Sequence, residues 1–309
     1  MRFAIYGFFF NKEFCFNNFY FSPIKKDLSF WEKVKFSTDK YRYNLTGYID
    51  TPEINSSEFI FTMQAVLTFV QQQDVIVKEI FDDDIQTEYS SNFERIGSGA
   101  PFAMYSDLQQ EIIEKLYFKL LDKTDLCNQK KNNSVFELDN NCEFSSLVYK
   151  VIEPFHMRKK FIEITYYLYF SGLEAFCKQY LKSYYPEINI VKDVSKNFAE
   201  MLEKLEINYI HICSKGKKNN LRNKINDKDK FLKLSLSTYS NLRNSLFHQN
   251  LFVAKVPCST KENDKKMVKI TDYECTLHRL CNVVILKYIG IENPSLDCSK
   301  WYTRFPLIK

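Results

Sequence analysis

The stretch FIEITYYLYFSGLEAFCKQYL, residues 161–181, places apolar residues at every third or fourth position. This spacing gathers them on one face of a helix and predicts a long amphipathic helix that Pro186 stops. Three further segments of the second half have the same period, and we expect helices at about 195–205, 229–247 and 273–285. Each apolar face must be buried against another, so the four segments predict a four-helix bundle.

The first hundred residues have a different pattern, in which short aromatic and β-branched runs alternate with turn residues. Such runs are typical of strands. Two segments have helical spacing instead: residues 64–73, and residues 106–121, where Ser106 and Gln109 form a capping box. The expected strands are residues 3–10, 14–21, 41–49, 59–62 and 75–81.

The two halves are separated by a segment rich in Asn and Lys, from about Cys127 to Cys142, that lacks periodicity. We therefore expect a domain boundary near residue 145, and a length of 309 residues suits two domains. The predicted fold class is α+β, with a strand-rich amino-terminal domain at 1–145 and an all-α four-helix bundle at 146–309.

Composition disfavours several classes of protein. The chain is 45% hydrophobic and 26% charged, which is ordinary for a folded protein and too apolar for general disorder. Gly97 and Gly99 form a G-x-G, but neither a third glycine nor a P-loop lysine follows, which disfavours nucleotide-binding loops. The nine cysteines form no C-x-x-C pair, so we interpret them as reduced core thiols rather than as disulfides or zinc ligands.

Membrane association is not expected. No apolar run approaches the roughly 18 to 20 residues of a membrane span, and the aromatic start lacks the features of a secretory signal. We expect a cytoplasmic protein.

One of the four histidines stands out. His248 closes the sequence Arg243-Asn-Ser-Leu-Phe-His248 near the end of the third expected helix. An Arg supplies a permanent charge and a fork of donors for phosphate, and an imidazole can move protons at neutral pH. We interpret His156 as a solvated helix start, and we assign no catalytic role to His211 or His278.

The motif resembles the signature of the HEPN family of four-helix ribonucleases, R-x(4 to 6)-H with a polar residue after the Arg, here Asn244. The sequence YFSGLEAFCK around Glu174 resembles the family's early helix with one acidic residue. The sequence LHRLCNVVILKYIG resembles the closing helix of the Apea-like subgroup. The resemblance covers about residues 150–290, and the first half is vaguely similar to the amino-terminal domain of Apea-like antiphage proteins.

This resemblance implies an endoribonuclease without metal or other cofactor, in which the RNA 2′-hydroxyl attacks the adjacent phosphate. His248 would act as general acid or base, and Arg243 would stabilise the charge on the phosphate. Asn244 lies four residues before His248 and could fix its tautomer, while Glu174 could pair with Arg243. The family pairs two bundles so that two motifs line one cleft, which implies a homodimer because this chain has one motif. The angle of about 140° between Arg243 and His248 around one helix agrees with this.

The resemblance also implies partners. We expect cleavage of structured RNA, with tRNA favoured, in phage defence or as a toxin, and a phage-derived trigger at the amino-terminal domain. Two alternatives stay open: a non-catalytic RNA-binding or dimerisation module on the same scaffold, and a regulator that senses a phosphate or nucleotide. HEPN toxins silenced by a nucleotidyltransferase have Tyr two places after the His, and Asn250 stands there in this chain, so that regulation is not expected.

A basic segment precedes the third expected helix. Residues 215–230 contain seven basic residues against Asp227 and Asp229. The segment is either a solvated connector or an arm that follows the phosphates of RNA. The candidate RNA-binding residues are Lys217, Lys218, Arg222 and Lys224.

Overall fold

The computed structural model describes nine stretches of the chain: residues 1–26, 42–52, 54–81, 87–90, 107–122, 142–157, 161–207, 228–257 and 265–292. Its mixture of helices and antiparallel strands gives the expected α+β class. The chain divides into two compact units, and the division falls within helix α4 (Cys142–His156). The first unit contains Met1–Asp122 and α4 from Ile152 onward, and the second contains α4 up to Val151 and the described residues that follow α4 from Phe161.

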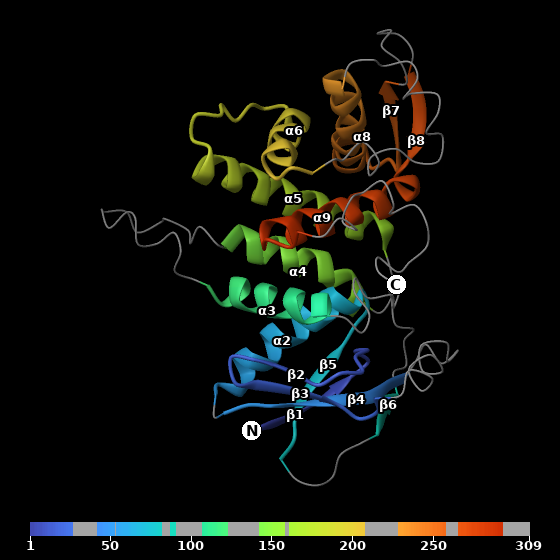
Figure 1. Cartoon of the computed structure of the whole chain (residues 1–309). Helices are drawn as coiled ribbons and strands as arrows, with labels where there is room; N and C mark the ends of the chain where they lie inside the picture. Colours follow the sequence, from blue (N-terminus) through green and yellow to red (C-terminus); the bar gives the residue numbers. More distant parts are fainter. Residues whose placement is uncertain are drawn as a thin grey trace. The chain divides into compact units, whose positions relative to one another are not determined.

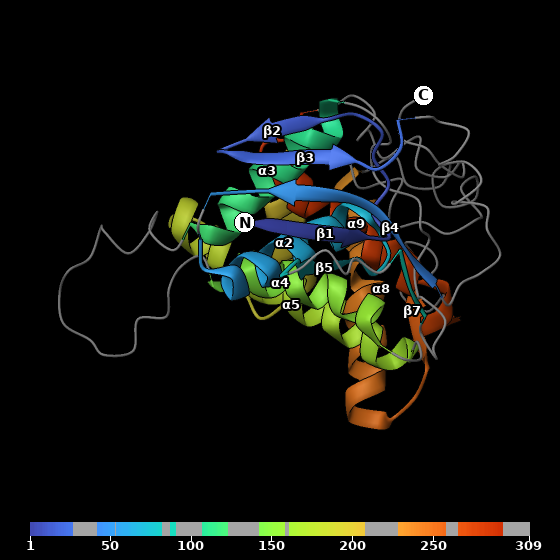
Figure 2. The same cartoon turned by 90° about the horizontal axis from the view of Figure 1, so that it is seen from below.

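The first unit is built on an antiparallel sheet. The strand order is β2-β3-β4-β1-β5, and β6 pairs with β4. Figure 2 shows β2, β3, β4 and β1 side by side. Gly47 in β4 permits a close approach, because a Cβ there would collide with the Phe10 ring and the carbonyl oxygen of Ser22. The strands are β1 (Arg2–Tyr6), β2 (Phe14–Phe16), β3 (Phe19–Pro23), β4 (Arg42–Asp50), β5 (Ile76–Glu79) and β6 (Glu88–Ser90).

The run expected as one strand at residues 14–21 is a hairpin of β2 and β3. Asn17 and Asn18 have φ of 46° and 66° at the turn. A two-residue hairpin with positive φ at both positions matches the right-handed twist of the strands, and Asn tolerates that conformation. The rings of Phe14 and Phe21 stack across the hairpin with centroids 4.4 Å apart.

The strand expected at residues 59–62 is wrong, because these residues belong to helix α2 (Ser56–Gln71). The side chain of Asn55 caps this helix by accepting a hydrogen bond from the backbone N–H of Glu58. The helix then extends through the expected helical segment at 64–73 and ends at Gln72, which has a φ of 55°. Local aromatic content favoured a strand, but the cap begins a helix there.

Helices α2 and α3 (Asp107–Leu121) cover one face of the sheet, and α3 confirms the helix expected at 106–121 (Figure 1). Phe59 of α2 contacts Phe3, with ring centroids 4.8 Å apart. Tyr117 of α3 contacts Phe19 edge to face, with ring centroids 5.3 Å apart. Successive residues of a strand point to opposite faces, so the neighbour of Phe3 in β1, Ala4, belongs to a second apolar cluster on the other face.

The second unit contains the four expected helices. They are α5 (Ile162–Tyr184), α6 (Val194–Lys204), α8 (Lys228–Gln249) and α9 (Glu274–Tyr288). Sequence analysis missed helix α4 and also the hairpin of β7 (Val253–Pro257) and β8 (Lys265–Lys269), which precedes α9 through a short 3-10 helix, η3 (Ile270–Asp272).

Helix α5 packs against α6, α8 and α9. Buried polar groups add specific links between these helices. The hydroxyl of Tyr166 donates to the carbonyl oxygen of Tyr239 at 2.9 Å, and the hydroxyl of Tyr239 donates to Thr276 Oγ1 at 2.9 Å. Each such hydrogen bond contributes about 1 kcal/mol, and breaking one leaves a buried group unsatisfied. These bonds fix α8 relative to α5 and α9.

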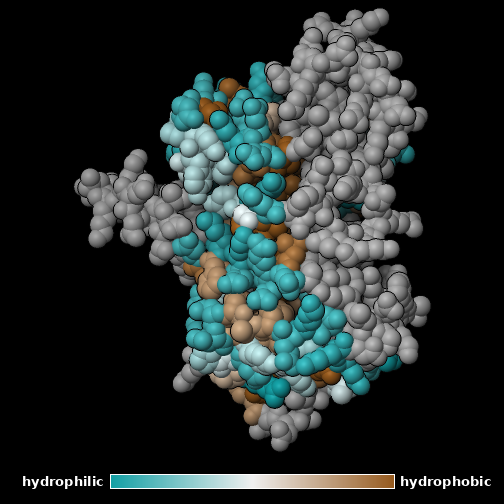
Figure 3. All heavy atoms as spheres, viewed as in Figure 1, coloured by the Kyte–Doolittle hydropathy of each residue, from teal (hydrophilic) through white to brown (hydrophobic). Residues whose placement is uncertain are grey.

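No helix in the described ranges combines the length and apolarity needed to cross a membrane. Figure 3 shows hydrophilic residues interspersed with apolar ones over the described part of the face in view. The interpretation of the cysteines as core thiols holds for Cys177 and Cys281, which are buried. It is wrong for Cys15 and Cys275, which are exposed.

Candidate functional site

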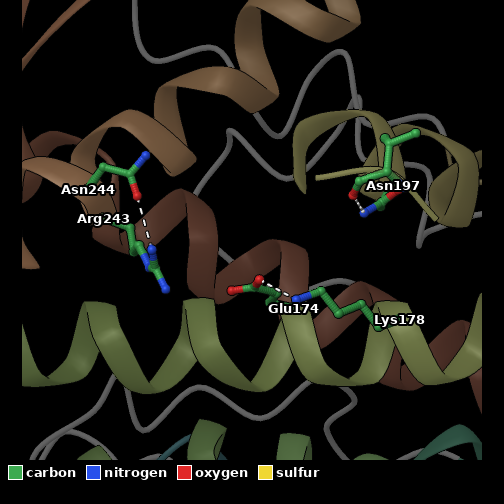
Figure 4. Close-up of polar contacts among 6 residues, drawn as sticks. Glu174, Lys178, Asn197, Arg243 and Asn244 are labelled. Atoms are coloured by element: carbon green, nitrogen blue, oxygen red, sulfur yellow. Dashed lines mark hydrogen bonds and ion pairs between the residues drawn. The ribbon is translucent and has the colours of Figure 1, made fainter. Parts of the chain in front are cut away.

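Arg243 lies at the edge of the packed face of α8. Its neighbour Leu242 is buried, whereas Arg243 itself is half-buried and Asn244 is exposed. The guanidinium carbon of Arg243 lies 5.8 Å from the ring centroids of both Phe170 and Phe247. Contact with these rings orients the side chain, because a guanidinium is attracted to an aromatic face. Figure 4 shows Arg243 reaching from α8 toward α5, on which Glu174 and Lys178 lie.

An open pocket of about 550 Å³ lies beside this arginine, and we call it the α5–α8 pocket. Basic and acidic side chains line the pocket, and the phenol ring of Tyr167 lines it as well. The lining residues are Glu143, Tyr167, Phe170, Ser171, Glu174, Ala175, Lys178, Gln179, Lys182, Ile190 and Arg243. The structure therefore brings Arg243 and Glu174, two of the expected site residues, to one pocket.

Glu174 and Arg243 do not form the expected ion pair. Oε1 of Glu174 lies 2.7 Å from Nζ of Lys178, one turn later on α5, and its side chain is only 18% exposed. Arg243 instead donates from Nη1 to Oδ1 of Asn244 at 3.0 Å. Within the described ranges, Arg243 has no carboxylate partner, so its positive charge at the pocket is not neutralised by an ion pair.

Asn244 has a different partner from the one expected. Its side-chain oxygen accepts the hydrogen bond from Arg243, and no hydrogen bond joins it to His248 in the described part of the chain. Spacing by four residues brings two side chains close on a helix, but it does not decide which neighbour they bind. A charged donor forms the stronger bond with the amide oxygen. Asn244 therefore positions the guanidinium of Arg243.

His248 is exposed in the last turn of α8. Neither a hydrogen bond nor an ion pair connects its ring to any described residue, and this includes Arg243. The five-residue spacing explains the separation, because it places the two side chains on different faces of the helix. Within one chain, the structure brings Arg243, Asn244 and Glu174 together and leaves His248 apart.

Asn250 ends α8 two residues after His248. It has a φ of 52°, a left-handed conformation that Asn adopts more readily than most residues. Its N–H donates to the carbonyl oxygen of Leu246, and the N–H of Leu251 donates to that of Ser245, so two terminal carbonyls are satisfied. Sequence analysis considered Asn250 only as a departure from the Tyr of some HEPN toxins.

Sequence analysis missed two aromatic residues beside the pocket. The rings of Tyr167 and Phe247 lie 4.6 Å apart, and the side chains are 41% and 50% exposed. Helical periodicity assigned Phe247 to the core, and no sequence signal distinguishes an exposed aromatic from a buried one at such a position. The basic candidates Lys217, Lys218, Arg222 and Lys224 lie outside the described residues, as does His211.

His156 has a polar environment of its own in the first unit. Its interpretation as a solvated helix start is wrong, because it ends α4 with its Nδ1 2.7 Å from Oδ1 of Asp74. The hydroxyl of Tyr43 donates to Oδ2 of Asp74 at 2.7 Å. Burial acts to lower the pKa of His156, but the hydrogen bond and charge of Asp74, with the charge of Glu153, outweigh it, and the pKa lies above the ordinary 6.5.

Comparison with known proteins provides no further assignment: no family model, no curated protein and no solved structure matches this chain significantly.

Proposed function

We propose that the chain is a metal-independent endoribonuclease of the HEPN type that cleaves structured RNA, with tRNA favoured. The observation that carries the proposal is the environment of Arg243, which lines an open pocket and has no carboxylate partner among the described residues. A guanidinium in this situation suits an anion such as a phosphate, because it offers both charge and several donors. His248, five residues later on the same helix, is exposed.

The proposed reaction needs two proton transfers. The 2′-oxygen of a ribose attacks the adjacent phosphorus and gives up its proton to a base, the O2′–P bond forms and the P–O5′ bond breaks. The leaving 5′-oxygen receives a proton, so the products are a 2′,3′-cyclic phosphate and a 5′-hydroxyl. His248 serves as the general acid or base, and Arg243 stabilises the negative charge that accumulates on the phosphate oxygens.

The separation of Arg243 and His248 supports a homodimer as the active form. One chain provides no direct contact between them, and each has free surface on a different side of α8. In a dimer through the helical unit, two motifs face one substrate. Glu174 then has an indirect role, since its ion pair with Lys178 holds a lysine at the wall of the pocket.

The same separation favours one alternative, a non-catalytic RNA-binding module in which Arg243 binds phosphate and His248 takes no part in chemistry. A phosphate- or nucleotide-sensing regulator would use the pocket in the same way. The cytoplasmic location also belongs to this proposal and rests on the sequence features that disfavour a membrane span and a secretory signal. The part in phage defence or growth arrest, and a phage-derived trigger at the amino-terminal unit, rest on the family resemblance.

The test is to incubate the purified full chain with total RNA and with tRNA in excess EDTA, and to map both ends of every product. We expect internal cleavage with 2′,3′-cyclic phosphate and 5′-hydroxyl ends. A His248→Ala preparation, purified identically, controls for contaminating nucleases. Activity that disappears with EDTA and returns with a divalent ion contradicts the mechanism. RNA binding without any cleavage favours the non-catalytic module.

A further inference from the structure

Two aromatic rings from different helices meet at the surface beside the α5–α8 pocket. Tyr167 comes from α5 and Phe247 from α8, and their rings lie 4.6 Å apart. About half of each side chain remains in water although both helices bury other aromatic residues in the core of this unit. We call this pair the aromatic platform.

The aromatic platform lies next to positive charge. The guanidinium carbon of Arg243 is 5.8 Å from the ring centroid of Phe247. Tyr167 lines the same pocket as Arg243, Lys178 and Lys182. The acidic groups there are Glu143 and Glu174, and Glu174 already pairs with Lys178. The surface at the aromatic platform thus combines exposed rings with the cation of Arg243, which has no carboxylate partner in the described part of the chain.

A nucleotide has matching chemistry, because it joins a flat aromatic base to a phosphate. Stacking of bases on aromatic side chains, combined with basic residues for the backbone, is the general way in which proteins hold single strands. A paired base inside a duplex has both faces covered by its neighbours, so only an unpaired base can reach an aromatic ring. A purely apolar partner would leave Arg243 without a counterion.

We propose that an unpaired nucleotide of RNA stacks its base on the aromatic platform of Tyr167 and Phe247 while its phosphate lies at Arg243. This inference rests on the proposed function and deepens it, since it makes the chain select single-stranded positions within structured RNA. Every base has a stackable face, so the selection depends on strand state and little on base identity.

The test measures binding of a short single-stranded RNA whose riboses carry 2′-O-methyl groups, which block the proposed cleavage. Fluorescence anisotropy compares the wild-type chain with Tyr167→Ala and Phe247→Ala. We expect each substitution to weaken binding by roughly 5- to 150-fold, the range for one stacked base. The conservative variants Tyr167→Phe and Phe247→Tyr keep a ring and should bind within about threefold of the wild type, because stacking depends on the ring face.

Two controls separate stacking from a general loss of apolar surface. Phe61 is 63% exposed on α2 in the first unit, and Phe61→Ala should bind RNA as the wild type does. A probe carrying 2-aminopurine reports stacking on the unmodified protein through quenching of its fluorescence, so the inference can be tested even if an alanine variant fails to fold.

The outcomes distinguish this inference from the proposed function. Unchanged affinity in both alanine variants overturns the inference and leaves cleavage standing, as does an equal loss in Phe61→Ala. Binding that depends on the aromatic platform, together with failure to cleave unmodified RNA, supports the inference and contradicts the ribonuclease. A wild-type chain that binds no single-stranded RNA but cleaves tRNA overturns the inference alone.

Discussion

Histidines stand in the last turns of two helices, and their surroundings differ. His156 ends α4, and its Nδ1 pairs with Asp74, which also accepts a hydrogen bond from Tyr43. His248 ends α8, is exposed, and has no polar partner among the described residues. Both lie at the negative end of a helix dipole. The difference therefore lies in what the rest of the chain provides.

Of the two histidine rings, only that of His156 is held by a polar contact within the described part of the fold. The side chain of His156 is only 28% exposed, and one of its nitrogens is held by a carboxylate, so its protonation is linked to folding. The ring of His248 has no such bond among the described residues and is exposed. Sequence analysis favoured His248 for chemistry and treated His156 as a solvated residue. The structure supplies His156 with a stabilising role instead.

The largest expected effects are a loss of cleavage when His248 or Arg243 is replaced and a loss of stability when His156 is replaced. His248→Ala should reduce RNA cleavage by roughly a hundred- to ten-thousand-fold, the contribution of a positioned acid or base, and Arg243→Ala by roughly a hundred- to a thousand-fold, the contribution of a donor that stabilises transition-state charge. The stability of His248→Ala should change by no more than about 0.5 kcal/mol, as for surface substitutions. Arg243→Ala should cost about 0.5–1 kcal/mol, because it loses the contacts with Phe170 and Phe247. His156→Ala should do the opposite, with lower stability and unchanged cleavage at a temperature where it stays folded. Cleavage rates and thermal midpoints measure both.

Retained cleavage in His248→Ala contradicts its catalytic role and leaves the binding module as the better function. Sedimentation of the wild type, performed at the concentrations used for cleavage, tests the homodimer. A monomer with full activity contradicts the proposal that two chains complete the site.

The next effect concerns how RNA is held by the second half of the chain. Replacing Lys217, Lys218, Arg222 and Lys224 with Gln should weaken RNA binding and reduce the slope of log affinity against log salt by up to about 3, because each phosphate contact contributes about 0.7 to 0.9. Binding at several salt concentrations gives the slope. Replacing exposed lysines of the first unit, such as Lys12 and Lys25, provides the control. An unchanged slope supports the connector interpretation of this segment.

Sequence periodicity predicted the helices of the second unit well, because α5, α6, α8 and α9 lie within a few residues of the expected segments. The sequence predictions were wrong where a helix cap or a turn outweighed the aromatic composition of a segment. The Asn55 cap makes residues 59–62 helical, and the Asn17-Asn18 turn divides one aromatic run into a hairpin. The strands of β7 and β8 are short, and no alternating pattern long enough to recognise marks them.

The candidate site was predictable only in part. Residue types and spacing identified Arg243 and Glu174, which line one pocket. They could not identify their partners: Glu174 pairs with Lys178, four residues later, and Arg243 donates to Asn244, the next residue. The pairing of His156 with Asp74 joins residues 82 positions apart in sequence. Such a contact depends on the tertiary fold, and no local pattern predicts it.

A smaller effect is the pH dependence of the stability that the pair of His156 and Asp74 contributes. The pKa of His156 is raised in the folded state, so the stabilisation from its charged pair with Asp74 is fully present below about pH 6.5 and is lost as pH rises through the folded pKa. Asp74→Asn should therefore cost about 1–3 kcal/mol near pH 6, the contribution of a hydrogen bond to a charged group, and less near pH 9. Urea unfolding across this range measures the difference.

Tyr43→Phe is the matched control for this prediction, because it removes a hydrogen bond to Asp74 without removing a group that titrates near neutral pH. Its cost should vary little between pH 6 and pH 9. The charge of Glu153 also acts on His156 and is unchanged in both variants. If the cost of Asp74→Asn instead grows with pH, the charged pair is not the source of the stabilisation.

The smallest effect concerns the residue that ends α8 just beyond His248. Asn250 has a φ of 52°, and a left-handed conformation costs a residue with a Cβ about 1–2 kcal/mol unless, like Asn, it tolerates that region. Asn250→Ala should therefore lower stability by about 1 kcal/mol, whereas Asn250→Gly should change it by only a few tenths, because glycine adopts positive φ freely. Denaturation midpoints followed by circular dichroism distinguish the two. Cleavage should persist in Asn250→Gly, since the variant keeps the geometry of the last turn that carries His248. Equal stability of the two variants would mean that the backbone conformation at residue 250 is not what requires Asn there.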